Sequence, residues 1–308
     1  MHHVLDAARP HLHGRFSSRA TPVLTLEPGD TVTVTNIPDV SWGLEAPTST
    51  TAPRRKVEPR DPVRDAGPCL CGPIAVRGAK PGDALDVTLE HIRPGAWGWT
   101  YAGRGMSNSA LNGALGIGDA PLMLLRWTIN QARTHATNDL GHTVRLRPFM
   151  GTIGLSPDAE DACGWTPRPC GGNMDCRELV EGAVLSLPVM TPGALLSLGD
   201  GHALQGDGEL SGTAIECPME EVRLRVNLRP GIALPGPRAR TPAGWVTLGF
   251  GPTLDQAAEV AASGMLDLLV EQHGTTRAEA AALASSLVSL HITQMVNPLR
   301  GVHAILAE

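Results

Sequence analysis

Residues 72–92, GPIAVRGAKPGDALDVTLEHI, place two apolar runs on either side of a Pro-Gly-Asp turn. After the turn, Leu85, Val87 and Leu89 alternate with more polar residues, and this period of two is typical of a half-buried β-strand. Residues 21–36, TPVLTLEPGDTVTVTN, repeat the arrangement around a second Pro-Gly-Asp turn. Each of the two segments is therefore predicted to form a β-hairpin.

Working outward from these segments, the chain places strands first and helices last. Short apolar runs predict further strands at 121–128, 143–147, 183–189, 193–198, 222–228 and 245–249. Apolar residues at helical spacing predict a helix at 254–272, and a Thr276/Glu279 capping box indicates a second helix within 275–290. This order favours an α+β fold, a β-rich sandwich or barrel-like core with a C-terminal helical pair.

Turn-forming residues are abundant, with 35 Gly and 26 Pro in 308 residues. Residues 45–67 are expected to form a surface loop, and residues 151–176 are mostly of turn type. Residues 95–120 are rich in Gly, Ser and Asn and form either a flap near a site or simply a long loop. No break divides the sequence, so a single domain is expected over 1–308, β-rich at 20–250 and helical at 254–290.

Composition limits the classes of function. The chain is 42% hydrophobic with a net charge of -6, which argues against binding nucleic acid or an anionic membrane. No apolar run reaches the roughly 18 residues of a membrane span, and the N-terminal segment lacks the blocks of a signal peptide, so a cytoplasmic protein is expected. The six cysteines include no CxxC pair and are expected to be reduced and buried, with a metal or redox role as the alternative.

Residues 195–216, LLSLGDGHALQGDGELSGTAIE, gather the most chemistry. The stretch contains Asp200, His202, Asp207, Glu209 and Glu216 among its glycines, without Lys or Arg to neutralise them. Grouped carboxylates repel one another and raise one another's pKa, and a bound cation would relieve that repulsion. The alternative is that the two Gly-Asp-Gly sequences are ordinary turns.

A three-ligand metal site is the interpretation that the spacing favours. If the strand at 193–198 extends to residue 202, Asp200 and His202 project to the same face and can bind one divalent metal. Imidazole suits Zn, Cu, Fe or Ni, and carboxylate and water broaden that range. Asp175, in GGNMDC at 171–176, is the best third ligand, and a fourth position would stay open for water, as in catalytic sites.

The remaining polar groups of the stretch have two interpretations each. Glu216 and Glu209 are candidate general bases, or else a structural residue and a solvated turn residue. The glycines either serve turns only or let a substrate approach backbone N–H groups that hold an oxyanion. Under the second interpretation, Gly201, Gln205 and Gly206 are the candidate substrate-binding residues.

Several motifs together resemble the acetamidase/formamidase family. They are GPIAVRGAKPGDALDVTL (72–89), PFMGTIGLSP (148–157), GGNMDC (171–176), LPVMTPGALLSLGDGHALQGDGELSGTAIE (187–216) and SLVSLHITQMVNP (286–298). They follow the family's order from about residue 21 to 300. The resemblance implies a β-rich α+β fold, assembly as a homodimer or larger, and hydrolysis of formamide or acetamide to the carboxylic acid and ammonia, with some relatives cleaving γ-lactams.

The resemblance also implies a divalent metal, with zinc the expected ion. By motif, Asp175, Asp200, His202 and Glu216 match site positions of the family, and Asp39 falls near another acidic site residue. Cys71 departs from the family, which commonly has Thr before this Gly-Pro. If such divergent segments line the pocket, the substrate is a larger amide or a lactam.

The expected mechanism is metal-assisted amide hydrolysis, with Asp175, Asp200 and His202 on the metal and Glu216 moving the proton. A first alternative is a cysteine nucleophile, Cys176 or Cys217, activated by Glu216. A second is a non-catalytic β-protein that binds a metal or a small ligand. Chelation separates the second from an enzyme, and thiol alkylation separates the first from a metal enzyme.

Overall fold

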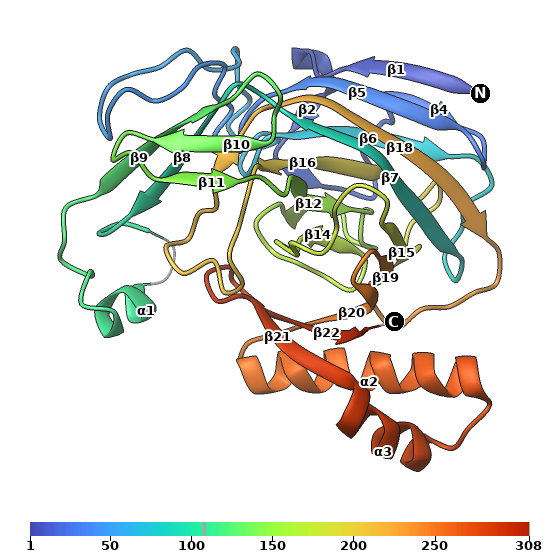
Figure 1. Cartoon of the computed structure of the whole chain (residues 1–308). Helices are drawn as coiled ribbons and strands as arrows, with labels where there is room; N and C mark the ends of the chain where they lie inside the picture. Colours follow the sequence, from blue (N-terminus) through green and yellow to red (C-terminus); the bar gives the residue numbers. More distant parts are fainter. Residues whose placement is uncertain (107–108, 308) are drawn as a thin grey trace.

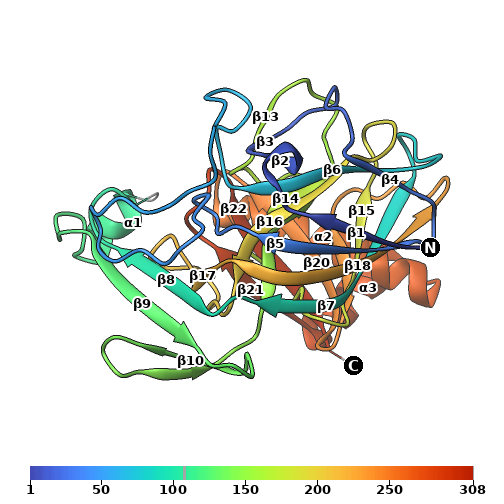
Figure 2. The ribbon, with the colours of Figure 1, turned by 90° about the horizontal axis from the view of Figure 1, so that it is seen from above.

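The computed structural model describes residues 1–106 and 109–307. Among these residues, two large β-sheets share one apolar core, to which strands of both sheets contribute buried Val, Leu and Ile side chains. Figures 1 and 2 show the two sheets as layers, with the helical pair on the outside. The β-rich α+β fold with a C-terminal helical pair is therefore confirmed.

The first sheet has nine strands and carries the C-terminal helices. In spatial order they are β1 (His2–Asp6), β5 (Thr31–Ile37), β18 (Met219–Arg229), β7 (Ala84–Pro94), β15 (Val184–Pro188), β19 (Arg238–Thr241), β20 (Gly244–Gly251), β22 (Arg300–Leu306) and β21 (Val288–Gln294). All neighbouring pairs are antiparallel except β1 with β5.

The second sheet has eleven strands and carries most of the polar stretch. Its main path is β11 (Thr143–Arg145), β10 (His135–Asn138), β9 (Met123–Ile129), β8 (Trp97–Ala102), β17 (Glu216–Cys217), β16 (Leu196–His202), β12 (Phe149–Gly154) and β14 (Gly171–Asn173). β6 (Leu70–Val76) also pairs with β16, and β2 (Leu12–His13) and β4 (Leu24–Leu26) pair with β6. A 3₁₀ turn at Arg9–His11 precedes β2, and β3 (Arg15–Phe16) pairs with β13 (Ala162–Cys163). Within the described residues neither sheet closes into a barrel.

The two predicted hairpins are wrong in their pairing, although their strands are real. β4 and β6 belong to the eleven-stranded sheet, whereas β5 and β7, which follow them, belong to the nine-stranded sheet. Each Pro-Gly-Asp turn therefore carries the chain from one sheet to the other. A turn motif sets the local bend, but the partner of each strand is chosen by long-range packing.

Both turns are built in the same way. The Asp83 carboxylate accepts a hydrogen bond from the Lys80 amide at 3.1 Å, and the Asp30 carboxylate accepts one from the Glu27 amide at 3.0 Å. The glycine before each Asp has a φ near +90°, which only glycine adopts readily. The repeated motif is thus a repeated connection between sheets.

The two helices that the sequence predicted near the C-terminal end are both present. α2 (Leu254–His273) begins at an N-cap Thr253 and ends at Gly274, and it buries Ala257, Ala261 and Met265 against β20 and β22. α3 (Arg277–Leu287) begins with the predicted capping box of Thr276 and Glu279. The predicted helical segment extends three residues too far, because residues 288–290 open strand β21, where β-branched Val288 and Ile292 pair with β22.

Other predicted strands are found close to their expected positions, and two expected loops contain strands. Residues 95–120 include β8 and helix α1 (Ser109–Ala114), and residues 107–108 of that segment lie outside the described residues. Residues 151–176 include β14 and most of β12. The division into a single domain stays a prediction. None of the described helices is long and apolar enough to cross a membrane.

Candidate active site

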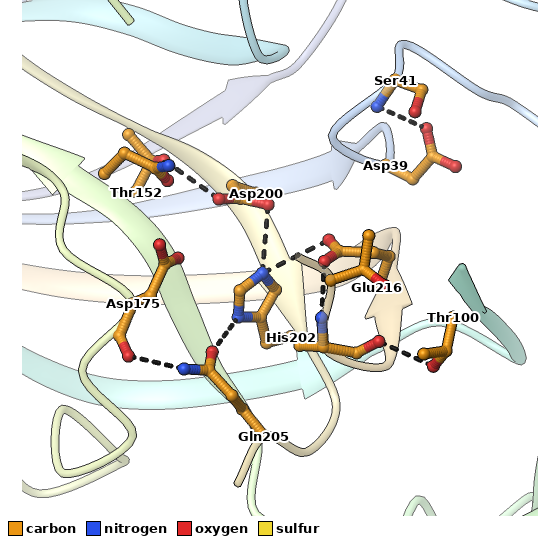
Figure 3. Close-up of polar contacts among 12 residues, drawn as sticks. Asp39, Ser41, Thr100, Thr152, Asp175, Asp200, His202, Gln205 and Glu216 are labelled. Carbon is orange, nitrogen blue, oxygen red and sulfur yellow. Dashed lines mark hydrogen bonds and ion pairs between the residues drawn. The ribbon is translucent and has the colours of Figure 1, made fainter. Parts of the chain in front are cut away.

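Strand β16 carries Asp200 and His202 near its end, the two residues that the sequence predicted to project to the same face. The strand extends to His202, and the two side chains meet, with Asp200 Oδ1 3.1 Å from His202 Nε2 (Figure 3). The other ring nitrogen of His202 lies 2.9 Å from Gln205 Oε1, and the ring packs nearly perpendicular to that of Phe149. The imidazole is therefore fixed on both sides.

Three further carboxylates lie around this pair. Glu216, at the start of β17, is the strand partner of His202, and its Oε2 lies 3.3 Å from His202 Nε2. Asp175 follows β14, and Glu209 belongs to the loop between β16 and β17. Ligand atoms of Asp175, Asp200 and His202 lie within 4.8 Å of one another, and so do those of His202, Glu209 and Glu216. We call these five residues the buried cluster, since each is at most 6% exposed.

The backbone at this site is held in an uncommon conformation. Asp175, Asp200 and Glu209 have φ values of 54°, 59° and 47°, in the left-handed region that residues other than glycine rarely occupy. Such conformations persist only where the surrounding structure enforces them, and they concentrate at functional sites. Here they turn three carboxylates toward one histidine.

A glycine makes room for the cluster. Gly151 lies in β12, beside β16, and a Cβ atom built on it would come within 2.8 Å of His202 Cε1, Asp175 Oδ1 and Asp200 Oδ2. Real Cβ atoms do not approach heavy atoms so closely. A side chain at this position would therefore occupy the space between the three predicted ligands.

Neutral donors hold some of the carboxylate oxygens and leave others unpaired. Asn297 Nδ2 donates to Asp175 Oδ2 at 2.5 Å, Thr152 Oγ1 lies 3.1 Å from Asp200 Oδ2, and the Ala214 amide donates to Glu216 Oε1 at 2.9 Å. Asp175 Oδ1, Glu209 Oε2 and Glu216 Oε2 are buried without a hydrogen-bond partner in the described structure. Buried polar atoms are rarely left so, and unpaired ones indicate a missing ion, water or substrate.

Burial and mutual repulsion shift the acidities of the cluster. Burial, then the charge of Asp200, raise the pKa of Asp175 to about 8, and burial raises the pKa of Glu216 to about 7. Burial and the charge of Asp175 raise the pKa of Glu209 well above its ordinary value. Burial acts against ionisation of His202, but Glu216 and Asp200 outweigh it and hold the pKa of His202 well above its usual range. The pKa of Asp200 is lowered, because contact with His202 outweighs burial.

The cluster forms part of the wall of a cavity of about 640 Å³. Asp175, Asp200, Glu209 and Glu216 reach it, and aromatic side chains Trp99, Tyr101 and Trp165 supply apolar wall. The remaining lining residues are Val40, Ser41, Gly105, Met106, Cys163, Asn173, Gly212, Thr213, Val296, Asn297, Pro298 and Arg300. An apolar cavity with a few convergent polar groups of shifted pKa is the usual form of a small-molecule site.

Comparison with known proteins shows that this chain is similar to one family. The model of the acetamidase/formamidase family matches residues 159–235, which contain all five residues of the buried cluster. A predicted acetamidase/formamidase from Thermoanaerobacter tengcongensis has a structure that superposes with a TM-score of 0.85 at 29% identity, over 100% of this chain and 96% of that one. These similarities confirm the resemblance to the acetamidase/formamidase family that the sequence motifs indicated.

Two further relatives give the extent of the similarity. An acetamidase from Bacillus halodurans has a TM-score of 0.84 at 28% identity, covering 99% of this chain and 97% of that one. An acetamidase from Mycolicibacterium smegmatis is 28% identical over 204 residues, which are 48% of this chain and 50% of the relative. The match thus spans about half the length of this curated relative.

Asp39 lies apart from the cluster (Figure 3). Its carboxylate is fully buried and accepts hydrogen bonds from Arg54 at 2.6 Å, from Trp99 Nε1 at 2.6 Å and from the amides of Ser41 and Gly43. With these donors around it, Asp39 is not available as the metal ligand that the resemblance implied. It instead fixes Trp99, and through it one wall of the cavity.

The expected substrate-binding residues lie behind the cluster. Gly201, Gln205 and Gly206 are not among the described lining residues of the cavity. Gln205 instead links two site segments, because its Oε1 contacts His202 while its Nε2 donates to the Asp175 carbonyl at 2.9 Å. Gly201 packs against Met219 and the Cys217 carbonyl, and Gly206 faces open space. Only Gln205 among them contacts the cluster side chains.

The cysteines fit the expectation that they are reduced and mostly buried. All six are free, and all but Cys163 are buried. Burial raises the pKa of the Cys176 thiol to about 12 and raises the pKa of Cys217 further. A thiol becomes a nucleophile by losing its proton, so both are poor candidates for the nucleophile of the first alternative. Cys71 is likewise buried in β6, with a pKa of about 12.

Three residues of the site escaped the sequence argument. Gly151 and Asn297 lie inside motifs that were quoted for the resemblance, PFMGTIGLSP and SLVSLHITQMVNP, but no local signal assigned them a role. Trp99 lies in the segment interpreted as a loop. The aromatic residues of WGWTYA (97–102) would have indicated a strand, because aromatic side chains are enriched in strands.

Proposed function

We propose that this chain hydrolyses the C–N bond of a small amide to a carboxylic acid and ammonia, assisted by a divalent metal at the buried cluster. The observation that carries the proposal is the cluster itself, in which four buried carboxylates surround one histidine at the cavity wall. The names of the family relatives, acetamidase among them, support an amide as the substrate.

The residues present fit a metal. Among the described ion pairs, His202 is the cationic partner of the cluster, and its contacts are with Asp200 and Glu216. Without a bound cation the cluster holds protons on its carboxylates, as the raised pKa values of Asp175 and Glu216 indicate, and three carboxylate oxygens have no hydrogen-bond partner among the described residues. Asp175, Asp200 and His202 would hold the ion, which when bound polarises a carbonyl and makes nearby water more acidic. Zinc matches the mixed imidazole and carboxylate donors.

Glu216 is placed to move the proton. Its Oε1 accepts a hydrogen bond from the Ala214 amide, while Oε2 lies 3.3 Å from His202 Nε2 and has no hydrogen-bond partner among the described residues. A pKa of about 7 lets the carboxylate take a proton from water and return it to the leaving nitrogen near neutral pH. Burial and the charge of Asp175 raise the pKa of Glu209 well above its ordinary value, which makes Glu209 a second candidate proton donor at the cavity.

The size of the cavity favours a second candidate, a larger amide or a γ-lactam. Pockets of about 300–1,000 Å³ hold ligands of drug size, and about 640 Å³ lies well inside this range. Formamide and acetamide have only a few heavy atoms and would leave most of this space empty. The aromatic wall of Trp99, Tyr101 and Trp165 suits an apolar group on the acyl side of the amide.

Zinc as the ion, a homodimeric assembly and a cytoplasmic location complete the proposal, and each comes from the family resemblance or from composition. The first experiment is ammonia release from formamide, acetamide, longer amides and a γ-lactam, with metal content measured in parallel. We expect release that stops on chelation and returns with zinc, and the best amide identifies the substrate class. Release that persists in fully chelated protein would contradict the metal. No release from folded, metal-loaded protein would leave a non-catalytic binding protein.

The buried carboxylates also predict a pH dependence of stability for the chelated chain. The pKa values of Asp175 and Glu216 in the folded chain, about 8 and about 7, exceed their ordinary values of 3.8 and 4.5. The folded state therefore binds more protons than the unfolded state between these values, and the free energy of unfolding decreases as pH rises through this range. His202 acts in the same direction, because its raised pKa stabilises the fold below, not above, its titration.

Denaturant unfolding of chelator-treated protein between about pH 6 and pH 8.5 measures this effect. We expect stability to fall across the range in the wild type and to fall less in Asp175→Asn. The exposed Asp158, which lies on the surface, provides the control Asp158→Asn, which should follow the wild type. A wild-type curve that rises over this range would contradict the assigned direction of the pKa shifts.

A further inference from the structure

Two histidines face each other on the C-terminal hairpin, outside the site described above. His291 in β21 and His303 in β22 are direct cross-strand partners. Their rings are stacked, with centroids 5.1 Å apart and planes 11° from parallel. Asp207, from the loop between β16 and β17, completes the group, with its Oδ2 3.4 Å from His291 Nδ1.

His303 is oriented as a metal ligand is oriented. Its side chain is fully buried, and Nδ1 lies 2.8 Å from Thr293 Oγ1. The other nitrogen, Nε2, is buried without a hydrogen-bond partner in the described structure. A proton on Nδ1, donated to the threonine, leaves the lone pair of Nε2 free, and such a contact behind the ring is what fixes metal-binding histidines. Leaving this nitrogen unpaired is otherwise costly.

The side chains of His291 and Asp207 are partly exposed to solvent. His291 and Asp207 have side chains that are 38% and 31% exposed, so an ion can reach the group from solvent. One ligand atom from each of the three residues lies within 4.8 Å of the others. Ligands of one zinc ion lie roughly 3.3 Å apart for bonds of about 2.0–2.1 Å, so the exposed His291 side chain would have to move toward the other two for all three to bind one ion.

We propose that Asp207, His291 and His303 form a second metal site, which binds a divalent transition metal such as zinc. Two imidazoles and one carboxylate are a donor set that zinc, nickel and copper accept, and water would fill the remaining position. None of the three residues is among the described lining residues of the cavity, so this site is separate from the buried cluster.

The place of the group in the fold indicates what the metal does. Gly208, next to Asp207, forms a backbone bridge with β21. The Gly208 amide donates to the Thr293 carbonyl, and the Met295 amide donates to the Gly208 carbonyl, both at 3.1 Å. A metal on Asp207 and the two histidines would fasten the same loop to the β21–β22 hairpin through side chains. Glu209 lies two residues further along this loop. The second metal thus acts as a clamp on the loop that carries Glu209.

Zinc binding to purified full-length protein tests the proposal. After chelation and desalting, wild type and variants are titrated with zinc alone, and the bound zinc per chain is measured by calorimetry and by metal analysis. We expect His291→Ala and Asp207→Asn each to bind about one zinc fewer than the wild type. The comparison counts zinc lost, so it does not depend on whether the buried cluster also holds metal.

A matched control and a second measurement make the result decisive. His135 is an exposed histidine on β10, and His135→Ala should bind as much zinc as the wild type. Zinc should also raise the melting temperature of the wild type more than that of His291→Ala, and Co²⁺ should give visible absorption that the variant loses. Equal zinc stoichiometry in the wild type and in folded His291→Ala and Asp207→Asn would overturn the site. Equal zinc loss in His135→Ala would also overturn it, by showing general binding to surface histidines.

Discussion

Replacing Glu216 with glutamine is expected to lower kcat for the best amide by roughly 10²–10⁴-fold, the usual contribution of a positioned general base. Glutamine has the same shape and can still accept the hydrogen bond that the Ala214 amide donates to Oε1. At Oε2, which lies 3.3 Å from His202 Nε2, the substitution puts an amide nitrogen that cannot take a proton. Steady-state ammonia release measures the effect, and KM should change far less than kcat.

Two comparisons support the assignment of this role. Glu259 is an exposed carboxylate on α2, and Glu259→Gln should have the activity of the wild type. Because removing a buried carboxylate relieves repulsion in the cluster, Glu216→Gln should fold and be at least as stable without metal. Near-normal turnover in a folded Glu216→Gln would remove Glu216 from the mechanism and transfer the role to Glu209.

The sequence predicted four members of the cluster because they are close in the chain, whereas Asp175 came from the separate GGNMDC motif at 171–176. Asp200 and His202 lie two residues apart on one strand, so the period of a strand puts them on one face. Glu216 follows after a loop short enough to bring β17 back beside β16, where it pairs with His202. Glu209 is buried because its loop pairs with β21. The sequence had left open that Glu209 is a solvated turn residue.

Features that depend on contacts between distant segments could not be predicted from the sequence. The two Pro-Gly-Asp turns were recognised, but their strands join different sheets, because the choice of partner depends on packing between residues far apart in sequence. Asp39 was assigned to the metal through the family resemblance, and the structure places Arg54 and Trp99 against it. The stacked His291 and His303 likewise follow from the register of β21 and β22, which no local motif predicts.

We expect Gly151→Ala to be the most damaging addition of a single methyl group at the candidate active site. The new Cβ would come within 2.8 Å of His202, Asp175 and Asp200, so at least one of them must move. None moves freely, because Gln205 holds His202, Asn297 holds Asp175 and Thr152 contacts Asp200. We expect a loss of stability of about 1–3 kcal/mol from overpacking. We also expect activity to fall about 10²-fold or more, since displacements of about 1 Å at a site have that effect.

The structure offers a matched control for this methyl group. Gly113, in α1, has no heavy atom within 4 Å of a built Cβ, so Gly113→Ala should retain activity and stability. Zinc content, ammonia release and denaturant unfolding should be measured on both variants. If the gap at Gly151 serves metal binding, zinc at the buried cluster is lost together with activity, while the zinc bound by Asp207, His291 and His303 stays. If Gly151→Ala keeps both activity and its full zinc content, the space between Asp175, Asp200 and His202 does not hold the ion, and the proposed ligand set is wrong.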